Sequence, residues 1–346
     1  MIKVGIVGAT GYTGQELVRL LLPHPDARIE CLTSNSYKGK RFSSVFPAFE
    51  GLVDLDLMST DDLAEIIERC DFLFFALPHG IAAGLLKDRD LAETRVIDLG
   101  ADFRLRNARD YQLWYQLEHP WPEGLSKSVY GLSEWRRDRI REATIVANPG
   151  CYATSVELAL IPLAEAGLLG DDTIVDAKSG VSGAGRSASI DTHFNECNES
   201  IKAYKVAAHR HTPEIEQELG SFSGQQKRIT FTPHLIPIQR GILSTIYCNL
   251  PEGVGIDEIR SLYRESYASE PFVRLLEDRQ SPETRWVAGT NYCDLSINID
   301  ERTERLIIIS ALDNLIKGAA GQAIQNMNIM SNFDETKGLS LLPRFP

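Results

Sequence analysis

The chain has 346 residues, of which 43% are hydrophobic and 24% charged, the composition of a globular protein with room for about two domains of roughly 150 residues. Its formal net charge of −12 excludes a broad basic face of the kind that binds nucleic acid without regard to sequence. No apolar run reaches the roughly 18 residues of a membrane span, and the N-terminus lacks the regions of a signal peptide. The six cysteines show no CxxC spacing, so we expect a cytoplasmic, reduced protein without a disulfide framework.

The first half of the chain alternates short apolar strands with helices. Strands are predicted over residues 2–7, 28–33, 72–77, 95–99 and 144–147, and helices over 15–22 and 61–69. Pro23 and Pro25 end the first helix. This alternation is typical of the α/β class with a parallel, doubly wound sheet.

The pattern changes after Gly150. A helix predicted over 153–166 is followed by strands over 173–178, 228–233, 241–250, 292–299 and 305–312. Several of these alternate apolar with polar residues, which suits an antiparallel sheet with one open face. We therefore place a domain boundary near residue 150. A helix over 314–330 is expected to pack back on the first domain, and residues 339–346 to form an irregular tail.

A glycine-rich turn follows the first strand and opens the first helix. It reads Gly8-Ala9-Thr10-Gly11-Tyr12-Thr13-Gly14, a GxxGxxG variant of the dinucleotide-binding pattern. Glycines here allow a tight turn and close approach of the backbone to a pyrophosphate, whose charge faces the helix N-terminus. The order of strand, turn and helix predicts a dinucleotide site; a glycine turn without a ligand is the alternative.

The end of the second strand favours NADP over NAD. An NAD site carries an acidic residue about 20 residues after the glycines, where it binds the ribose 2′-hydroxyl. Here the hydroxyl-rich stretch 33–36, with Ser34 and Ser36, is followed by Lys38, Lys40 and Arg41. Hydroxyl groups and cations suit a 2′-phosphate, which a carboxylate would repel. If the stretch is only a solvated basic loop, the missing acid still disfavours NAD.

Cys151 follows a short strand and a Pro-Gly turn and stands at the start of a helix, in the segment NPGCYAT at 148–154. The positive end of a helix dipole lowers the pKa of a thiol and favours the reactive thiolate. A buried, inert cysteine is the alternative. The other five cysteines lie in apolar or undistinguished settings, and we interpret them as structural.

A nucleophilic thiolate commonly works with a histidine. His209 and His211 lie in the segment HRHTPE, just before a predicted helix, with Glu214 at its end. These groups are candidates for a base and for a carboxylate that orients an imidazole. No third ligand stands at an obvious spacing, so no metal site is predicted. The Pro-flanked His24 and His119 are expected to be exposed loop residues.

Together these segments resemble the N-acetyl-γ-glutamyl-phosphate reductase family, part of the aspartate-semialdehyde-dehydrogenase-like group. The resemblance runs nearly end to end and is carried by GATGYTG (8–14), FFALPHG (74–80), DLGADFRL (98–105), YGLSE (130–134), NPGCYAT (148–154), KSGVSGAGR (178–186), HRHTPEI (209–215), TPHLIPIQRGI (232–242) and NLIKGAAGQAIQN (314–326). Members often have Ser where this chain has Gly100, a difference that a loop backbone tolerates. The resemblance implies a Rossmann domain of residues 1–150 plus 314–346. It also implies a catalytic, substrate-binding and oligomerisation domain of residues 151–313 with a mixed or antiparallel sheet.

The resemblance also implies residue roles. Cys151 would be the nucleophile, His211 or His209 the acid/base, with His211 favoured, and Glu214 the orienting partner. Substrate binding would fall to Arg104, Asn148, Ser179, Arg186 and Arg240, although any single arginine can be a plain surface charge. The loop around Ser182 either wraps a ligand or forms a plain hairpin. NADP(H) would contact Gly8, Thr10, Gly11, Tyr12, Thr13, Gly14, Ser34, Ser36, Lys38, Pro78, His79, Ser182, Gly183 and Asn314.

The implied reaction is the NADPH-dependent reduction of an acyl phosphate in arginine biosynthesis. The thiolate would attack N-acetyl-γ-glutamyl phosphate, release phosphate and hold a thioester, which hydride reduces to the semialdehyde. Two alternatives stay open: the lysine-pathway reductase of N-acetylaminoadipyl phosphate, one methylene longer, and an NADP-sensing protein without catalysis. We expect a homo-oligomer, a dimer or tetramer, and neither a nucleic-acid nor a membrane partner.

Overall fold

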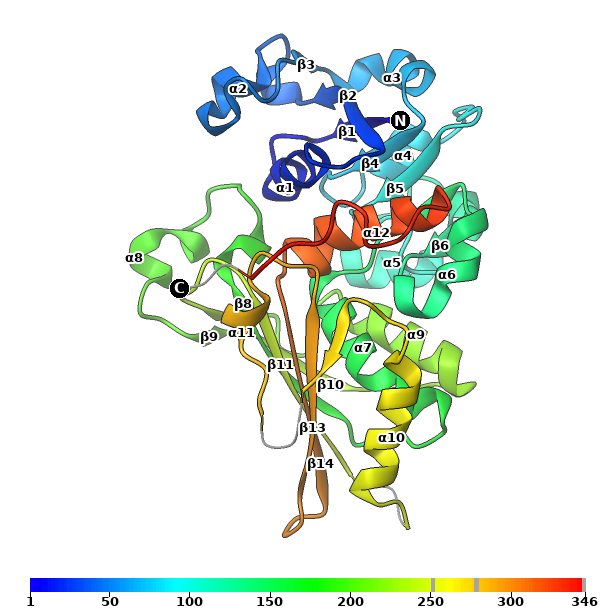
Figure 1. The fold of residues 1–346 in the computed structure, drawn as a ribbon, viewed down its shortest axis with the longest axis vertical. Coiled ribbons are helices and arrows are strands. Elements are labelled where there is room, and N and C mark those ends of the chain that lie inside the picture. Colours follow the sequence, from blue (N-terminus) through cyan, green and yellow to red (C-terminus); the bar gives the residue numbers. More distant parts are fainter. Residues whose placement is uncertain (250–252, 277–279, 344–346) are drawn as a thin grey trace. The chain divides into compact units, whose positions relative to one another are not determined.

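The structure, a computed structural model, describes residues 1–249, 253–276 and 280–343 and divides into two compact units (Figure 1). The first unit is Met1–Pro149 with Ala319–Ser340, and the second is Gly150–Gly318 with a short segment that begins at Leu341. No helix of the described residues combines the length and the apolar character needed to cross a membrane.

The first unit is built on a seven-stranded sheet in the order β3-β2-β1-β4-β5-β7-β6, whose pairings are all parallel. Central strands of such a sheet are covered on both faces, and all four residues of β4 are buried. The strands are β1 (Ile2–Val7), β2 (Ala27–Thr33), β3 (Leu57–Met58), β4 (Phe72–Phe75), β5 (Arg95–Asp98), β6 (Ser128–Tyr130) and β7 (Ile145–Ala147). The helices are α1 (Tyr12–Leu21), α2 (Phe42–Val45), α3 (Leu63–Arg69), α4 (Ala82–Leu86), α5 (Ala108–Tyr115) and α6 (Ser133–Glu142).

A helix from the far end of the chain completes this unit. All ten residues of α12 (Gly321–Met330) are buried, and the helix packs against α1 and α6 (Figure 1). Amide nitrogens of its side chains donate hydrogen bonds to the backbone: those of Gln322 and Asn326 both donate to the carbonyl oxygen of Gly131, at 3.0 and 2.8 Å. A buried amide without such a partner would cost free energy, so these bonds explain why the helix tolerates polar residues there.

The second unit is built on a mixed sheet in the order β12-β13-β14-β11-β8-β10-β9, in which β8 pairs parallel to β10 and antiparallel to β11. The long apolar helix α7 (Cys151–Glu165) packs on β11 and β14, and α9 (Thr212–Ser223) packs beside it. The strands are β8 (Ile174–Gly180), β9 (Lys202–Ala203), β10 (Thr230–Ile236), β11 (Ile242–Asn249), β12 (Val273–Leu275), β13 (Cys293–Asp300) and β14 (Arg305–Leu312). The other helices are α8 (Phe194–Cys197), α10 (Ile256–Tyr267) and α11 (Thr284–Val287).

The predicted fold class, a doubly wound parallel sheet with a second α/β domain, is confirmed. The helix predicted over 314–330 begins later than expected, because residues Ile316–Ala320 form a π-helical turn ahead of α12. Residues 314–318 belong to the second unit rather than the first, since Asn314 bonds to Ser182 and Gly241 of that unit. Leu250, expected in β11, and residues 344–346 of the expected tail lie outside the described residues.

Candidate active site

The glycine-rich turn between β1 and α1 has a backbone geometry that side chains would block. Gly8 has φ +95°, and a Cβ on it would lie 2.5 Å from the carbonyl oxygen of Ala76. A Cβ on Gly14 would lie 2.7 Å from the Cα of Ala9. Gly11 is the N-cap of α1, whose first amide groups have no acceptor within the helix. The turn therefore brings bare backbone to a helix N-terminus, the arrangement that binds a pyrophosphate.

Hydroxyl side chains join the ends of β1 and β2 beside this turn. The amide of Gly8 donates to the Thr33 hydroxyl at 3.0 Å, and the hydroxyls of Thr10 and Ser34 lie 2.8 Å apart. Ser36, Lys38, Lys40 and Arg41 follow on the surface. The Lys38 ammonium lies 3.9 Å from the carboxylate of Asp62, too far for a tight ion pair, and its side chain is 56% exposed. Of the residues predicted for the 2′-phosphate, Ser36 and the cations therefore face solvent, whereas Thr33 and Ser34 are buried.

The segment after β4, which carries Pro78 and His79, is held by Asp102. The Asp102 carboxylate accepts hydrogen bonds from the amides of Gly80 at 2.5 Å and Ala83 at 3.0 Å. The His79 ring packs against Tyr115, with centroids 5.4 Å apart. Because β4 pairs in parallel with β1, this segment and the glycine turn leave the sheet at the same edge. Ligands of open parallel sheets bind at that edge.

Arg104 and Asn148 support the turn that leads into Cys151. The guanidinium of Arg104 is buried and donates to the carbonyl oxygens of Asn148 and Leu99, both at 2.9 Å. The side-chain amide of Asn148 donates to the carbonyl oxygen of Ala319 at 3.2 Å. These bonds fix the backbone on the N-terminal side of the predicted nucleophile, and a direct substrate contact for either residue stays a prediction.

Cys151 is the first residue of α7, with Gly150 in extended conformation as the N-cap. The amides of the first helical turn have no acceptor within the helix, so they are available to an oxyanion. Cys151 is partly exposed, whereas Cys31, Cys70, Cys248 and Cys293 are buried and Cys197 is partly exposed. A Cβ on Gly318 would lie 2.7 Å from the Cβ of Cys151, so the backbone at 318 packs directly against this residue.

The two histidines of the HRH segment pack edge to face, with ring centroids 4.8 Å apart, just before α9. The Nδ1 atom of His209 accepts a hydrogen bond from the amide of His211 at 3.2 Å, so the ring proton of neutral His209 is on Nε2. Burial, with smaller contributions from the charges of His211, Lys205 and Arg210, lowers the pKa of His209 to about 2. His209 is therefore neutral at physiological pH, and His211 is the more exposed of the two.

Glu214, in the first turn of α9, is fully buried and accepts a hydrogen bond from the amide of Gly150 at 2.8 Å. The bond joins the helix that follows the histidines to the N-cap of the cysteine helix. Sequence reasoning gave no sign of it, because the two residues lie 64 positions apart. The role we expected for Glu214, orienting an imidazole, stays a prediction.

Two tyrosines that the sequence did not indicate, Tyr152 and Tyr204, lie beside His209. The hydroxyl of Tyr204 donates to that of Tyr152 at 3.3 Å, and Tyr152 donates to the carbonyl oxygen of His234, also at 3.3 Å. The His209 ring packs edge-on against both, at centroid distances of 5.5 and 5.6 Å. Burial, opposed by the hydrogen bond to Tyr152 and aided by the nearby charge of Cys151, raises the pKa of Tyr204 to about 12. Tyr204 therefore lies within electrostatic range of the cysteine as a neutral phenol.

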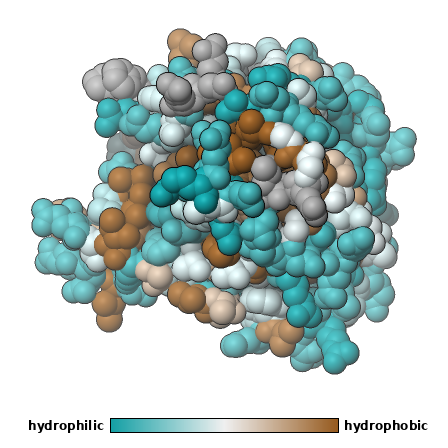
Figure 2. Space-filling model, turned by 90° about the horizontal axis from the view of Figure 1, so that it is seen from below, coloured by the Kyte–Doolittle hydropathy of each residue, from teal (hydrophilic) through white to brown (hydrophobic). Residues whose placement is uncertain are grey.

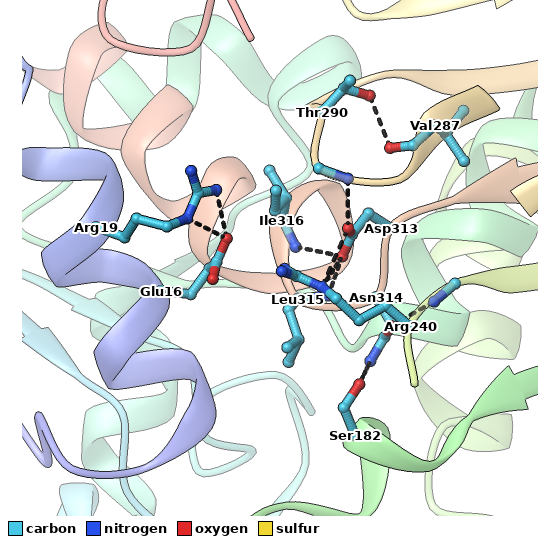
Figure 3. A network of polar contacts seen from close by, with 12 residues as sticks. Glu16, Arg19, Ser182, Arg240, Val287, Thr290, Asp313, Asn314, Leu315 and Ile316 are labelled. Atoms are coloured by element: carbon cyan, nitrogen blue, oxygen red, sulfur yellow. Dashed lines mark hydrogen bonds and ion pairs between the residues drawn. The ribbon is translucent and has the colours of Figure 1, made fainter. Parts of the chain in front are cut away.

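Asn314 joins two other segments of the second unit that carry predicted ligand residues (Figure 3). Its side chain accepts from the amide of Gly241 at 2.8 Å and donates to the hydroxyl of Ser182 at 3.0 Å. Ser182 lies in the 3-10 turn Val181–Ala184, whose backbone pairs with that of residues 238–239. A Cβ on Gly183 would lie 3.1 Å from the hydroxyl oxygen of the buried Ser179. Arg186 follows in an exposed stretch, and Arg240 precedes Gly241.

The expectation that His24 and His119 are exposed was wrong. Both are 3% exposed. The ring of His24 is hydrogen-bonded to the side chain of Asn328 at 3.0 Å, and that of His119 to the carbonyl oxygen of Asp102 at 2.6 Å. Flanking prolines indicated a turn correctly, but these turns pack onto the domain core. Within the described residues no three His, Cys, Asp or Glu side chains form a group suited to a metal ion.

Each of the two units matches a domain of known proteins. The NAD binding domain of semialdehyde dehydrogenases matches residues 3–143, and the dimerisation domain of the same enzymes matches residues 151–314. The chain is 52% identical over 340 residues to N-acetyl-gamma-glutamyl-phosphate reductase of Pelotomaculum thermopropionicum, with 98% of each chain covered. It is 51% identical to the Moorella thermoacetica protein of the same name, with 99% of each chain covered.

Solved structures show the same fold at lower identity. Aspartate semialdehyde dehydrogenase II from Vibrio cholerae superposes with a TM-score of 0.73 at 17% identity, covering 96% of this chain and 99% of that one. Aspartate semialdehyde dehydrogenase with NADP from Candida albicans has a TM-score of 0.71 at 16% identity, with the same coverage. At such identities the likeness concerns the fold.

Proposed function

Because the chain belongs to the N-acetyl-γ-glutamyl-phosphate reductase family and is an NADP-dependent oxidoreductase, we propose that Cys151 carries the acyl group of its substrate as a thioester. The reaction is the reduction of N-acetyl-γ-glutamyl phosphate to N-acetylglutamate semialdehyde and phosphate, a step of arginine biosynthesis. The single observation that carries the proposal is the position of Cys151, at the start of α7 and next to the tyrosine that packs against both imidazoles.

The thiolate sulfur of Cys151 attacks the γ-carbonyl carbon, and the bond to phosphate oxygen breaks. Phosphate leaves with the electron pair, and the acyl group stays on sulfur. The helix N-terminus favours the thiolate and offers amide donors to the oxyanion that forms at the carbonyl. After hydride has reached the thioester carbonyl carbon, the oxyanion there collapses: the carbon–sulfur bond breaks, its electron pair returns to sulfur as the thiolate, and the carbon is released as the aldehyde.

His211 is the proton carrier that the geometry favours. The pKa of His209 is lowered to about 2, so its imidazole is neutral at physiological pH. Its Nδ1 lone pair already accepts a hydrogen bond from the amide of His211. A group whose pKa lies so far from neutrality is a poor acid/base near pH 7. His211 is more exposed and packs against Tyr152, the residue after the nucleophile, at a centroid distance of 6.1 Å. We assign His209 the task of holding His211 in place.

Arg240 is the arginine that we assign to the substrate carboxylate or phosphate. Its side chain is 22% exposed and is held by a buried acid, so the guanidinium is ordered before an anion arrives. Ser179 and Arg186 are assigned to the same substrate. The guanidinium of Arg104 donates hydrogen bonds to two backbone carbonyls, so we assign it mainly to stabilising the turn before Cys151.

The residues of the first unit fit NADP(H). The glycine turn leaves a cradle that a Cβ at Gly8 or Gly14 would fill, and the exposed Ser36 and Lys38 suit a 2′-phosphate. When bound, the cofactor supplies the hydride that reduces the thioester. The chain's contribution is to bind the pyrophosphate on backbone amides and the phosphate on cations. Pro78 and His79 of the first unit belong to the same assignment, and cofactor contacts of Ser182, Gly183 and Asn314 of the second unit stay a prediction.

We assign oligomerisation to the second unit, in a dimer or tetramer of this chain in the cytoplasm. The match of residues 151–314 to a dimerisation domain supports this assignment. Several large apolar side chains there are exposed, namely Ile190, Phe194, Ile201 and Val206. The face shown in Figure 2 is mostly hydrophilic, with apolar residues gathered in a few separate patches. Sedimentation of the purified protein that gives only a monomer would overturn the assignment.

One assay tests the proposed function. The purified protein, given N-acetylglutamate semialdehyde, phosphate and NADP, should generate NADPH, and arsenate should replace phosphate. Cys151→Ser should abolish turnover while leaving NADP affinity nearly unchanged. Faster turnover of the aminoadipate semialdehyde, one methylene longer, would support the lysine-pathway alternative instead. Tight NADP binding without turnover of either substrate would support the sensor.

A further inference from the structure

A single buried carboxylate organises three segments of the second unit (Figure 3). Asp313 is fully buried directly after β14. Its Oδ2 accepts from the amide of Gly289 at 2.8 Å, and its Oδ1 from the amide of Leu315 at 2.9 Å and of Ile316 at 3.3 Å. The Nε of Arg240 lies 3.2 Å from Oδ2 and 3.3 Å from Oδ1.

The contact with Arg240 is more than a surface ion pair. The side chain of Asp313 is 0% exposed and that of Arg240 is 22% exposed, so the carboxylate depends on the guanidinium and the amides for its charge balance. The carboxylate is bonded through Nε, the inner nitrogen of the guanidinium. This fixes the plane in which the terminal nitrogens lie, and the plane decides whether they can bind a planar anion in two places.

The same residue fixes the backbone that packs against the nucleophile. Asp313 accepts from Leu315 and Ile316 with its side chain and from the amide of Gly318 with its main-chain carbonyl, at 2.9 Å. Gly318 lies in the π-helical turn Ile316–Ala320, where a Cβ would come within 2.7 Å of the Cβ of Cys151. A shift of this turn therefore changes the space around Cys151.

We propose that Asp313 is a positioning residue that couples the anion-binding guanidinium of Arg240 to the placement of Cys151. It touches neither substrate nor sulfur. It acts on substrate binding through Arg240 and on the nucleophile through the turn at 315–318. The inference rests on the proposed function, since it takes Arg240 as the substrate-binding arginine and Cys151 as the nucleophile.

The first test is Asp313→Asn, which removes the charge that holds Arg240 and leaves a single, weaker acceptor oxygen where the carboxylate held the amides of Leu315 and Ile316. We expect KM for N-acetylglutamate semialdehyde to rise about tenfold, while kcat falls by less than about threefold. The side-chain NH2 group of the new asparagine would also face the backbone N–H of Gly289, donor against donor, so this variant can fold poorly. Asp313→Glu serves in that case: it keeps the charge, displaces the carboxylate by one methylene, and should raise KM in the same way.

A double-mutant cycle separates this inference from its premise. Arg240→Gln should itself raise KM, and adding Asp313→Asn should then raise KM no further. Independent, multiplying effects of the two substitutions would overturn the coupling while leaving Arg240 as a substrate residue. An unchanged KM in Arg240→Gln would overturn the role of Arg240 and the coupling with it.

A second readout addresses the nucleophile directly. The rate at which iodoacetamide labels Cys151 should change at least about threefold in Asp313→Asn but not in Arg240→Gln, because only the former disturbs the turn at 315–318. The matched control is Asp294→Asn, which breaks another pair of this unit between a fully buried aspartate and a partly exposed arginine, Arg274, at 2.6 and 2.9 Å. This control should lose stability without changing KM or the labelling rate. An equal change in the control would show that the effect is general loosening and would overturn the proposal.

Discussion

Glu214 accepts a buried hydrogen bond from the backbone amide of Gly150 at 2.8 Å. Gly150 is the N-cap of α7, and the next residue is Cys151. Glu214 stands in the first turn of α9, for which His211 is the N-cap. One carboxylate therefore sets how the end of the histidine segment lies relative to the start of the cysteine helix.

This relationship predicts that Glu214 acts on catalysis through geometry. Glu214→Ala leaves the buried amide of Gly150 without its acceptor, which should cost about 1–3 kcal/mol of unfolding free energy. The same change should lower kcat at least about tenfold, because the proton carrier and the thiol lose their fixed separation. Glu214→Gln keeps an acceptor oxygen and should retain most of both quantities. Urea unfolding and steady-state kinetics measure them.

Glu218 provides the matched control, since it is equally buried one helical turn later on α9. Glu218→Ala should lower unfolding free energy but leave kcat within about twofold of wild type. If Glu214→Ala and Glu218→Ala reduce kcat to the same extent, the bond to Gly150 has no special bearing on the site.

Cys151 should be the residue whose alkylation stops the reaction. Two of the six cysteines are partly exposed, Cys151 and Cys197, and the other four are buried. Iodoacetamide should therefore inactivate the enzyme as Cys151 becomes labelled, and bound substrate should protect it. Cys197→Ser should be inactivated at the same rate as wild type, whereas Cys151→Ser has no activity to lose. Peptide mass mapping identifies the labelled residue; inactivation that follows label on Cys197 would contradict the assignment.

The two sheets show which strands can be predicted from the sequence and which cannot. Strands in the middle of each sheet were predicted because their apolar runs or alternation extend over several residues. The four strands not predicted, β3, β6, β9 and β12, are two or three residues long, and each forms an edge of its sheet. So short a strand has no measurable periodicity, and it forms only because a neighbouring strand is already in place.

The candidate site shows the same limit. Cys151, the HRH segment and the glycine turn were found because their residue types and local spacing carry the chemistry. Tyr204 and Asp313 were missed because their importance comes from tertiary contacts. The hydroxyl of Tyr204 donates to that of Tyr152, and the carboxylate of Asp313 pairs with Arg240. Neither residue type nor spacing indicates such pairs in a single sequence.

Lys38 should decide between the two nicotinamide cofactors. Its ammonium lies in the exposed group that we assign to the 2′-phosphate, which NAD lacks. Lys38→Ala should raise the Kd for NADP about five- to tenfold, less at high salt, and leave the Kd for NAD unchanged. Arg28→Ala, at the other end of β2 with a side chain 54% exposed against 56% for Lys38, should change neither. Equal weakening of both cofactors in Lys38→Ala would remove this lysine from the phosphate site.

The buried His209 should make the protein less stable in mild acid. Its pKa is lowered from an ordinary 6.5 to about 2, first by burial, so the folded protein keeps it neutral where the unfolded chain binds a proton. Between these two values the unfolded state holds more protons, and unfolding free energy falls as the pH falls below about 6.5. Between pH 7.5 and pH 5.5, one such histidine lowers the unfolding free energy by about 1.4 kcal/mol.

His209→Gln should remove that part of the acid sensitivity in urea unfolding at the two pH values. A remainder should persist, because burial also lowers the pKa of His24. The exposed His193 is the control, and His193→Gln should show the full wild-type loss. In the kinetics His209→Gln should keep the pH dependence of kcat, whereas His211→Gln should lose one limb of it, because His211 is the proposed proton carrier. The opposite pattern would make His209 the acid/base, and its pKa in the complex would then have to lie far above the value that burial gives it here.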